Sequence, residues 1–85
     1  MEEIRDRKFV PVTVRFDESG KMRPMEIEFE DDNGRKVYKV DKVLDVRRAA
    51  CQSAGGTGER YTCRIHGKET YLWYDGRWWV ALKRR

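Results

Sequence analysis

The chain has 85 residues, of which 40% are charged and 39% are hydrophobic, and its formal net charge is +4. A chain of this length forms one domain with a thin core, which argues against a deep, dry active site. The charge is uneven, because residues 1–41 carry nine Lys/Arg and eleven Asp/Glu (a balance of −2), whereas residues 42–85 carry ten and four (a balance of +6). The basic half also holds all three tryptophans, so we expect an anionic partner to bind there.

The sequence also argues against several cellular and chemical roles. No stretch approaches the roughly 18 apolar residues of a membrane span, and residues 1–6 lack the apolar core of a signal peptide, so we expect a cytoplasmic protein with no membrane contact. Cys51 and Cys63 do not form a CxxC pair, and with the single His66 they are too few for a zinc site. We expect reduced thiols, with Cys63 packed as a small apolar residue, and neither metal nor cofactor.

The N-terminal part of the chain predicts an edge strand. Residues 1–8 are charged and are expected to be frayed, and residues 9–83 are expected to form a single small β domain. Apolar side chains alternate along residues 9–16, which is typical of a strand, and Pro11 places this strand at a sheet edge or at a strand start. A turn follows at residues 17–20.

The next predicted strand has one acidic face. Its apolar side chains are those of Met25, Ile27 and Phe29, and they alternate with Glu26, Glu28 and Glu30. Residues 31–34 then close a hairpin onto residues 35–40. The acidic row could bind a cation or a basic partner, but a solvated sheet face that resists aggregation is the favoured interpretation.

Residues 43–51 have two interpretations. Asp41 could cap a helix that runs through Ala54 and ends at Gly55, which would place one short helix near 43–54. The segment 43–46 also suits a strand, and we favour the strand because the neighbouring segments are strand-like and connections are short.

A glycine-rich segment, residues 53–58, follows as a predicted connector between strands. It lacks the Gly-Lys-Ser/Thr ending of a phosphate-binding loop, and no helix clearly follows it. Arg47 and Arg48 before the segment, with Arg60 after it, could still close it over a phosphate-bearing ligand.

Residues 61–82 give the strongest structural signal. Three short runs are joined by His66-Gly67 and by Asp75-Gly76, and X-Gly pairs between alternating runs predict a three-stranded antiparallel meander. A two-residue turn at 75–76 places Trp73 opposite Trp78. At the other turn, Cys63 lies opposite Thr70 or Leu72, depending on whether the corner is 66–67 or 67–68.

This register divides the meander into two faces, because side chains alternate along each strand. The first face is the expected core and carries Tyr61, Cys63, Ile65, Leu72, Tyr74, Trp79 and Ala81. The second face carries Arg60, Thr62, Arg64, Glu69, Tyr71, Trp73, Trp78 and Val80.

The second face has two interpretations. The favoured one is that the N-terminal strands or a small barrel cover Trp73 and Trp78. In the other, part of the face stays open, and the aromatic rings stack on nucleobases while Arg60 and Arg64 contact phosphates. If both indoles are buried, the stacking role is lost and only the basic rim remains.

Together these segments predict an all-β fold. We expect a small, strongly bent antiparallel sheet or an SH3-like barrel of about six to seven short strands. Such folds occur in nucleic-acid binders and in peptide binders alike, so the fold does not choose between these functions.

The chain also resembles a known group of proteins. Residues 28–30 (EFE), 34–47 (GRKVYKVDKVLDVR) and 54–65 (AGGTGERYTCRI) look like a small uncharacterised family of clostridia and related Gram-positive bacteria, over nearly all of residues 9–82. The pattern in 34–45 is partly similar to an actinobacterial domain of unknown function, some members of which are encoded near Y-family DNA polymerases. The resemblance implies an accessory role in DNA damage tolerance and supplies no catalytic residues.

These observations predict a binding module and not an enzyme, since one histidine and no convincing nucleophile–base pair argue against general acid–base catalysis. The leading hypothesis is single-stranded nucleic acid as the ligand. The candidate residues are Arg47, Arg48, Arg60, Arg64, Tyr71, Trp73 and Trp78. The alternative is a protein-interaction module that docks on a larger cytosolic partner through the same face or an exposed edge strand.

Overall fold

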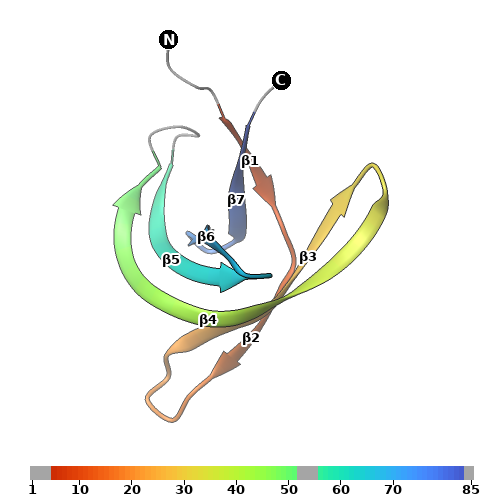
Figure 1. The fold of residues 1–85 in the computed structure, drawn as a ribbon. Coiled ribbons are helices and arrows are strands. Elements are labelled where there is room, and N and C mark those ends of the chain that lie inside the picture. The colour runs from red at the N-terminus through yellow and green to blue at the C-terminus, as the bar shows by residue number, and fades with distance from the viewer. Residues whose placement is uncertain (1–4, 52–55, 84–85) are drawn as a thin grey trace.

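The computed structural model describes residues 5–51 and 56–83, and within them the chain forms seven strands and no helix (Figure 1). The all-β prediction is therefore confirmed. The strands are β1 (Arg5–Phe9), β2 (Val12–Phe16), β3 (Met22–Asp31), β4 (Gly34–Ala50), β5 (Thr57–Ile65), β6 (Lys68–Tyr74) and β7 (Trp78–Lys83).

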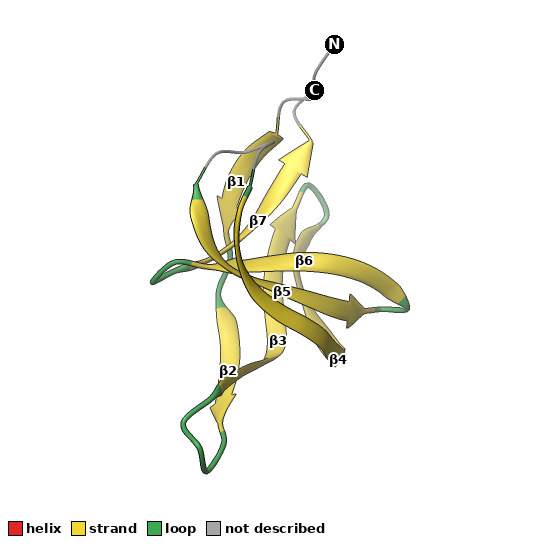
Figure 2. Cartoon of the chain, turned by 90° about the vertical axis from the view of Figure 1, so that its left-hand side faces the viewer, coloured by secondary structure: helices red, strands yellow, loops and turns green. Residues whose placement is uncertain are grey.

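The strands form one antiparallel sheet in the order β1-β7-β6-β5-β4-β3-β2. The sheet is strongly bent but is not closed into a barrel, and its edge strands β1 and β2 follow each other in the chain (Figure 2). At the junction, the Val10 amide donates to the Trp78 carbonyl at 3.0 Å, and the Glu28 amide donates to the Pro11 carbonyl at 2.9 Å. The predicted strand 9–16 is thus divided where the chain changes its pairing partner.

Strand β1 begins earlier than the sequence suggests. Residues 5–8, which we expected to be frayed, pair with β7 in a register that runs from Arg5 opposite Lys83 to Phe9 opposite Trp79. Residues 1–4 lie outside the described part of the chain.

Strand β4 resolves the ambiguous segment in favour of a strand. Residues 43–50 belong to this 17-residue strand, which forms a long arc in Figure 1. Its pairing shifts register around Asp41 and Leu44, and such bulges bend a strand. The first part of β4 therefore pairs with β3 and the second part with β5. The alternative helix near 43–54 is wrong through residue 50, because pairing with β5 satisfies the backbone there; residues 52–54 lie outside the described ranges.

The core lies on one side of β5–β7, which we call the inner face. It combines meander residues with N-terminal residues, so the N-terminal strands cover this side. Its buried members are Val10, Ile27, Val40, Tyr61, Cys63, Ile65, Leu72, Trp78 and Val80. The Trp78 ring lies 5.0 Å from the Tyr61 ring and 4.8 Å from the Tyr74 ring, centroid to centroid.

A second, smaller cluster lies on the opposite side, which we call the outer face. Trp73 and Trp79 are buried there together with Cys51, and Ala49 and Ala81 pack against them. The indole rings of Trp73 and Trp79 are stacked, with centroids 5.0 Å apart and an interplanar angle of 10°.

The first turn of the meander follows the prediction. His66 and Gly67 have φ values of 53° and 77°, so both adopt the left-handed conformation of a two-residue hairpin turn. Cys63 then lies opposite Thr70, which selects the corner at 66–67.

The second turn differs from the prediction by one residue. Tyr74 pairs with Trp78 and Trp73 pairs with Trp79, so the loop contains Asp75, Gly76 and Arg77. The predicted two-residue turn is wrong, and every side chain of β7 changes face as a consequence. Trp78 and Val80 join the inner core, whereas Trp79 and Ala81 join the outer cluster.

The longer turn is closed by its own hydrogen bonds and also contacts β1. The Asp75 amide donates to the Arg77 carbonyl at 3.2 Å, and the Arg77 amide donates to Asp75 Oδ1 at 3.3 Å. The Arg77 guanidinium lies 3.7 Å from the centroid of the Phe9 ring, and Arg7 Nη1 lies 3.8 Å from Asp75 Oδ2. Both contacts join residues that are far apart in the sequence, so the local Asp-Gly signal could not reveal them.

Candidate functional site

The tryptophans form part of the structure and do not form an open platform. Trp73 is 4% exposed and Trp78 is 9% exposed, and one ring packs on Trp79 while the other lies in the inner core. Neither ring presents a free face to a nucleobase. We therefore correct the sequence-based assignment by removing Trp73 and Trp78 from the candidate ligand contacts.

Tyr71 and Arg60 are the aromatic and basic pair that remains at the surface. Tyr71 is 50% exposed, and Arg60 Cζ lies 4.5 Å from the centroid of its ring. The edge of the Tyr71 ring also contacts Trp73, with centroids 6.5 Å apart at 75°. The surface pair thus rests on the buried Trp73–Trp79 stack, which holds it in place.

Arg60 is held by packing and not by an ion pair. Its Nε is buried and has no hydrogen-bond partner among the described residues. Neither a salt bridge nor a side-chain hydrogen bond engages its terminal nitrogens in the described part of the chain. A buried donor without an acceptor is unfavourable by about 1–3 kcal/mol.

Two further arginines share the outer face with Arg60. Arg47 lies directly opposite Arg60 on the neighbouring strand, and Arg64 lies opposite Glu69 on the other side. Arg47 Nε donates to Asp45 Oδ2 at 2.6 Å, and this hydrogen bond, followed by the charge of Asp45, raises the pKa of the Arg47 guanidinium. We call Arg47, Arg60, Arg64 and Tyr71 the basic surface.

Arg48 is separated from the basic surface. It lies opposite Glu59, and the alternation of side chains along β4 turns it away from Arg47. Together with Thr57, Gly58 and Tyr74 it lines a small hollow on the inner side. Of the seven predicted residues, the structure therefore brings four together.

Of the glycine-rich segment 53–58, the structure describes residues 56–58. The Cys51 amide donates to the Gly56 carbonyl at 2.8 Å, which closes the base of the connector. The predicted closure of the loop over a phosphate by Arg47, Arg48 and Arg60 depends on residues 52–55, which lie outside the described residues.

The acidic row of β3 faces basic partners of the same hairpin. Glu26 lies opposite Lys39 and Glu30 lies opposite Arg35, with 4.0 Å between Glu30 Oε2 and Arg35 Nη2. Across residues 5–51 and 56–83, no three His, Cys, Asp or Glu side chains gather closely enough to hold a metal ion. The same ranges contain no helix of the length and apolarity that crossing a membrane requires.

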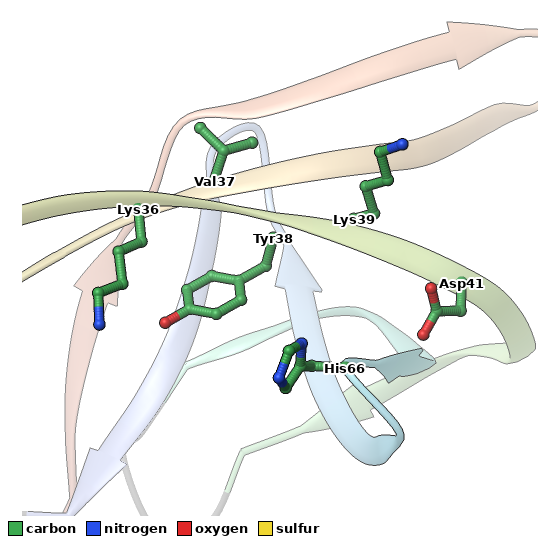
Figure 3. A pocket seen from close by; sticks show the side chains of 6 residues that line it. All are labelled: Lys36, Val37, Tyr38, Lys39, Asp41 and His66. Atoms are coloured by element: carbon green, nitrogen blue, oxygen red, sulfur yellow. The ribbon is translucent and has the colours of Figure 1, made fainter.

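A second cationic feature was not predicted from the sequence. A shallow hollow is lined by Lys36, Val37, Tyr38, Lys39, Asp41 and His66. Lys36, Tyr38 and His66 point to one side of β4, and Val37 and Lys39 point to the other (Figure 3). The rings of Tyr38 and His66 meet edge to face, with centroids 6.2 Å apart.

This hollow adjoins the basic surface, since His66 is two residues from Arg64. The β3–β4 hairpin and the β5–β6 turn meet here through pairing of Val40 with Ile65. Local sequence patterns could not find this site, because its two walls come from segments more than 20 residues apart.

Comparisons of the chain with family models, with curated proteins and with solved structures found no match. The candidate site is therefore argued from the geometry of this chain alone, and the family resemblance noted in the sequence stays a prediction.

Proposed function

We propose that this protein is a non-enzymatic, cytoplasmic binding module that takes single-stranded nucleic acid across its basic surface. The observation that carries the proposal is the guanidinium of Arg60 at 4.5 Å over the half-exposed ring of Tyr71. Nucleobases stack on aromatic rings and on arginine planes, and this pair offers both.

The neighbouring arginines supply the charge. Arg47 and Arg64 lie on the same face as Arg60, on adjacent strands and four residues along β5. Four residues of a strand span about 13 Å, which suits a stretch of a few nucleotides and not a long duplex. In this arrangement, Arg47 and Arg64 contact phosphates on either side of a base stacked at Arg60 and Tyr71.

The resemblance to proteins encoded near Y-family DNA polymerases agrees with a nucleic-acid partner. It supplies a biological context for the proposal, a role in DNA damage tolerance, and that context is part of what the proposal predicts.

The proposal is tested by NMR titration of the labelled protein with a short mixed-sequence oligodeoxynucleotide. We expect the signals of Arg60 and Tyr71 to move, while the indole signal of Trp78 stays in place. Single-strand binding loses affinity with a slope of about 0.7 per phosphate contact, so the two contacts of Arg47 and Arg64 predict a loss of roughly 7-fold between about 50 and 200 mM salt.

Matched variants distinguish binding at this site from nonspecific attraction between nucleic acid and a basic protein. Arg60→Gln and Tyr71→Ala should each weaken binding, the latter by about 1–3 kcal/mol if one base stacks there. Arg35→Gln makes the same charge change on the β3–β4 hairpin and should leave affinity unchanged. Signals that stay fixed at millimolar oligonucleotide, or equal losses for Arg60→Gln and Arg35→Gln, would contradict the proposal.

A protein-interaction role is the second candidate, and a different surface favours it. Phe16 is 64% exposed and Val46 is 46% exposed, and both line one hollow beside β4. Docking through such apolar side chains should change little with salt, which distinguishes this candidate from nucleic-acid binding.

A further inference from the structure

Strands β3 and β4 diverge and leave a wedge between them. The β3–β4 ladder ends at Glu26 opposite Lys39, and β4 then turns to pair with β5. Residues 22–24 of β3 pair only with β2 in the described chain. Beyond Lys39, the β3 side of β4 therefore has no strand partner among the described residues, and Figure 1 shows β4 curving away from the β2–β3 hairpin.

A hollow of about 680 Å³ occupies this wedge. Its lining residues are Phe16, Gly20, Lys21, Met22, Val46, Glu59, Tyr61 and Tyr74. The hairpin β2–β3 supplies one wall, Val46 of β4 supplies the other, and the tyrosines of β5 and β6 form the floor. The Tyr61 hydroxyl donates to the Met22 carbonyl at 3.4 Å, which ties the hairpin to the floor.

The rim of this hollow is positively charged. Lys21 lies on the hairpin wall, and Arg47 and Arg48 follow Val46 directly on the β4 edge. Two acids lie beside these three cations: Asp45 accepts from Arg47 at 2.6 Å, and Glu59 lines the hollow and lies opposite Arg48. The three cations outnumber the two acids by one, so the rim keeps a net positive charge that favours an acidic occupant over a basic one.

We propose that this groove binds an extended peptide segment of another protein, with alternating apolar and acidic side chains, as an added strand on β4. Residues 45–50 are the regular stretch of β4 beyond its last register shift, and they offer backbone groups for pairing. Alternate side chains of an extended peptide point to opposite sides. The apolar set would enter the hollow at Phe16 and Val46, while the acidic set would face Arg47 on the opposite side of the sheet.

The inference rests on the second candidate function and uses the free edge of β4, which shares Arg47 with the basic surface but does not include Arg60 or Tyr71. Its probe is a fluorescein-labelled nine-residue peptide of alternating valine and glutamate, measured by fluorescence anisotropy. We expect saturable binding and NMR shifts at the amides of residues 45–50. A peptide with lysine in place of glutamate should bind at least tenfold more weakly.

Two valines of the same strand give a matched pair of variants. Val46→Ser should weaken binding about tenfold, because burying one valine accounts for roughly that factor. Val37→Ser replaces a valine that is 55% exposed on the part of β4 paired with β3, and it should leave binding unchanged. Since both valines are exposed, both variants should fold, and circular dichroism checks this.

Four results would overturn the inference: no binding at millimolar peptide, equal losses for Val46→Ser and Val37→Ser, equal affinity for the lysine peptide, or a dimer in light scattering that Val46→Ser dissociates. The last result would make a second copy of the chain the occupant. Arg60→Gln should keep full peptide affinity, and Val46→Ser should keep full oligonucleotide affinity, so the failure of one proposal can be told from the failure of the other.

Discussion

The two turns of the C-terminal meander join strands of the same sheet, but only one of them has the loop length that its sequence predicts. His66-Gly67 forms the two-residue turn that its sequence predicts, whereas Asp75-Gly76 is extended by Arg77. In the first turn, His66 and Gly67 both adopt the left-handed conformation that a two-residue hairpin turn requires. The second turn is closed by hydrogen bonds between Asp75 and Arg77, and both residues also contact β1, which pairs with β7.

The difference of one residue decides which tryptophan lies on which face. With the three-residue loop, Trp79 stacks on Trp73 and supports the Arg60–Tyr71 pair, while Trp78 fills the inner core. A prediction in which this turn is one residue too short therefore places Trp79 in the core and Trp78 under the candidate site, the reverse of the observed arrangement.

The largest expected effect comes from breaking the outer stack. Trp79→Ala removes a fully buried indole and should lower the free energy of unfolding by about 3–5 kcal/mol in urea denaturation. Trp78→Ala should cost a similar amount, but only Trp79→Ala should also shift the ring signals of Tyr71. A cost below about 1 kcal/mol for Trp79→Ala would contradict the observed packing.

The next effect tests how closely the meander packs at the second turn. A Cβ on Gly58 would lie 2.6 Å from the Tyr74 carbonyl oxygen, a backbone atom that cannot move aside cheaply. Gly58→Ala should therefore cost about 1–3 kcal/mol, measured by thermal and urea unfolding. Gly67→Ala meets open space but a φ of 77°, so it should cost about 1–2 kcal/mol through backbone strain alone. Unchanged stability of Gly58→Ala would show that this approach is looser than observed.

A smaller effect is expected from shortening the second turn to the two-residue length of the first. Deleting Arg77 leaves Asp75-Gly76 as a two-residue loop between the same partners, Tyr74 and Trp78. The faces of β7 should stay as they are, and the loss of the cation–π contact with Phe9 should cost about 0.5–1 kcal/mol. Loss of the Trp73–Trp79 contact in this variant would show that the loop length does not set the register.

The smallest effect is a loss of stability at alkaline pH, which does not occur at neutral pH. Burial, followed by the charge of Glu59, raises the pKa of Tyr61 to about 12, and burial raises the pKa of Cys63 to about 11. Both groups are neutral in the fold, so their contribution to stability is complete below their ordinary pKa values of 10.0 and 9.0 and is lost as pH rises through the raised values.

Denaturation midpoints measured from pH 8 to 12 check this dependence. Tyr61→Phe should flatten the upper part of the decline, and Tyr71→Phe, which alters an exposed tyrosine, should not. An identical decline in wild type and Tyr61→Phe would contradict the assignment.

The sequence predicted well wherever a local pattern sets the structure. The alternation along β5 and β6 places Tyr61 and Leu72 inside and Arg60 and Tyr71 outside, as the structure has them. The buried Cys63 also behaves as the small apolar residue we expected.

The sequence-based predictions failed where contacts between distant segments determine the structure. The second turn packs against β1, and two bulges bend β4 between two partners. The exposed hollows arise where separate hairpins meet. Only long-range pairing specifies these features, so the stacking of Trp79 on Trp73 and the groove at Val46 could not be derived from residue patterns alone. The burial of Trp73 and Trp78 itself agrees with the favoured interpretation of the sequence.

The placement of the tryptophans is tested most directly by nuclear Overhauser contacts in the free protein. We predict contacts of the Trp79 indole with Trp73 and Cys51, and contacts of the Trp78 indole with Tyr61 and Tyr74. Contacts between Trp78 and Trp73, with Trp79 against Leu72, would restore the shorter turn and contradict this account.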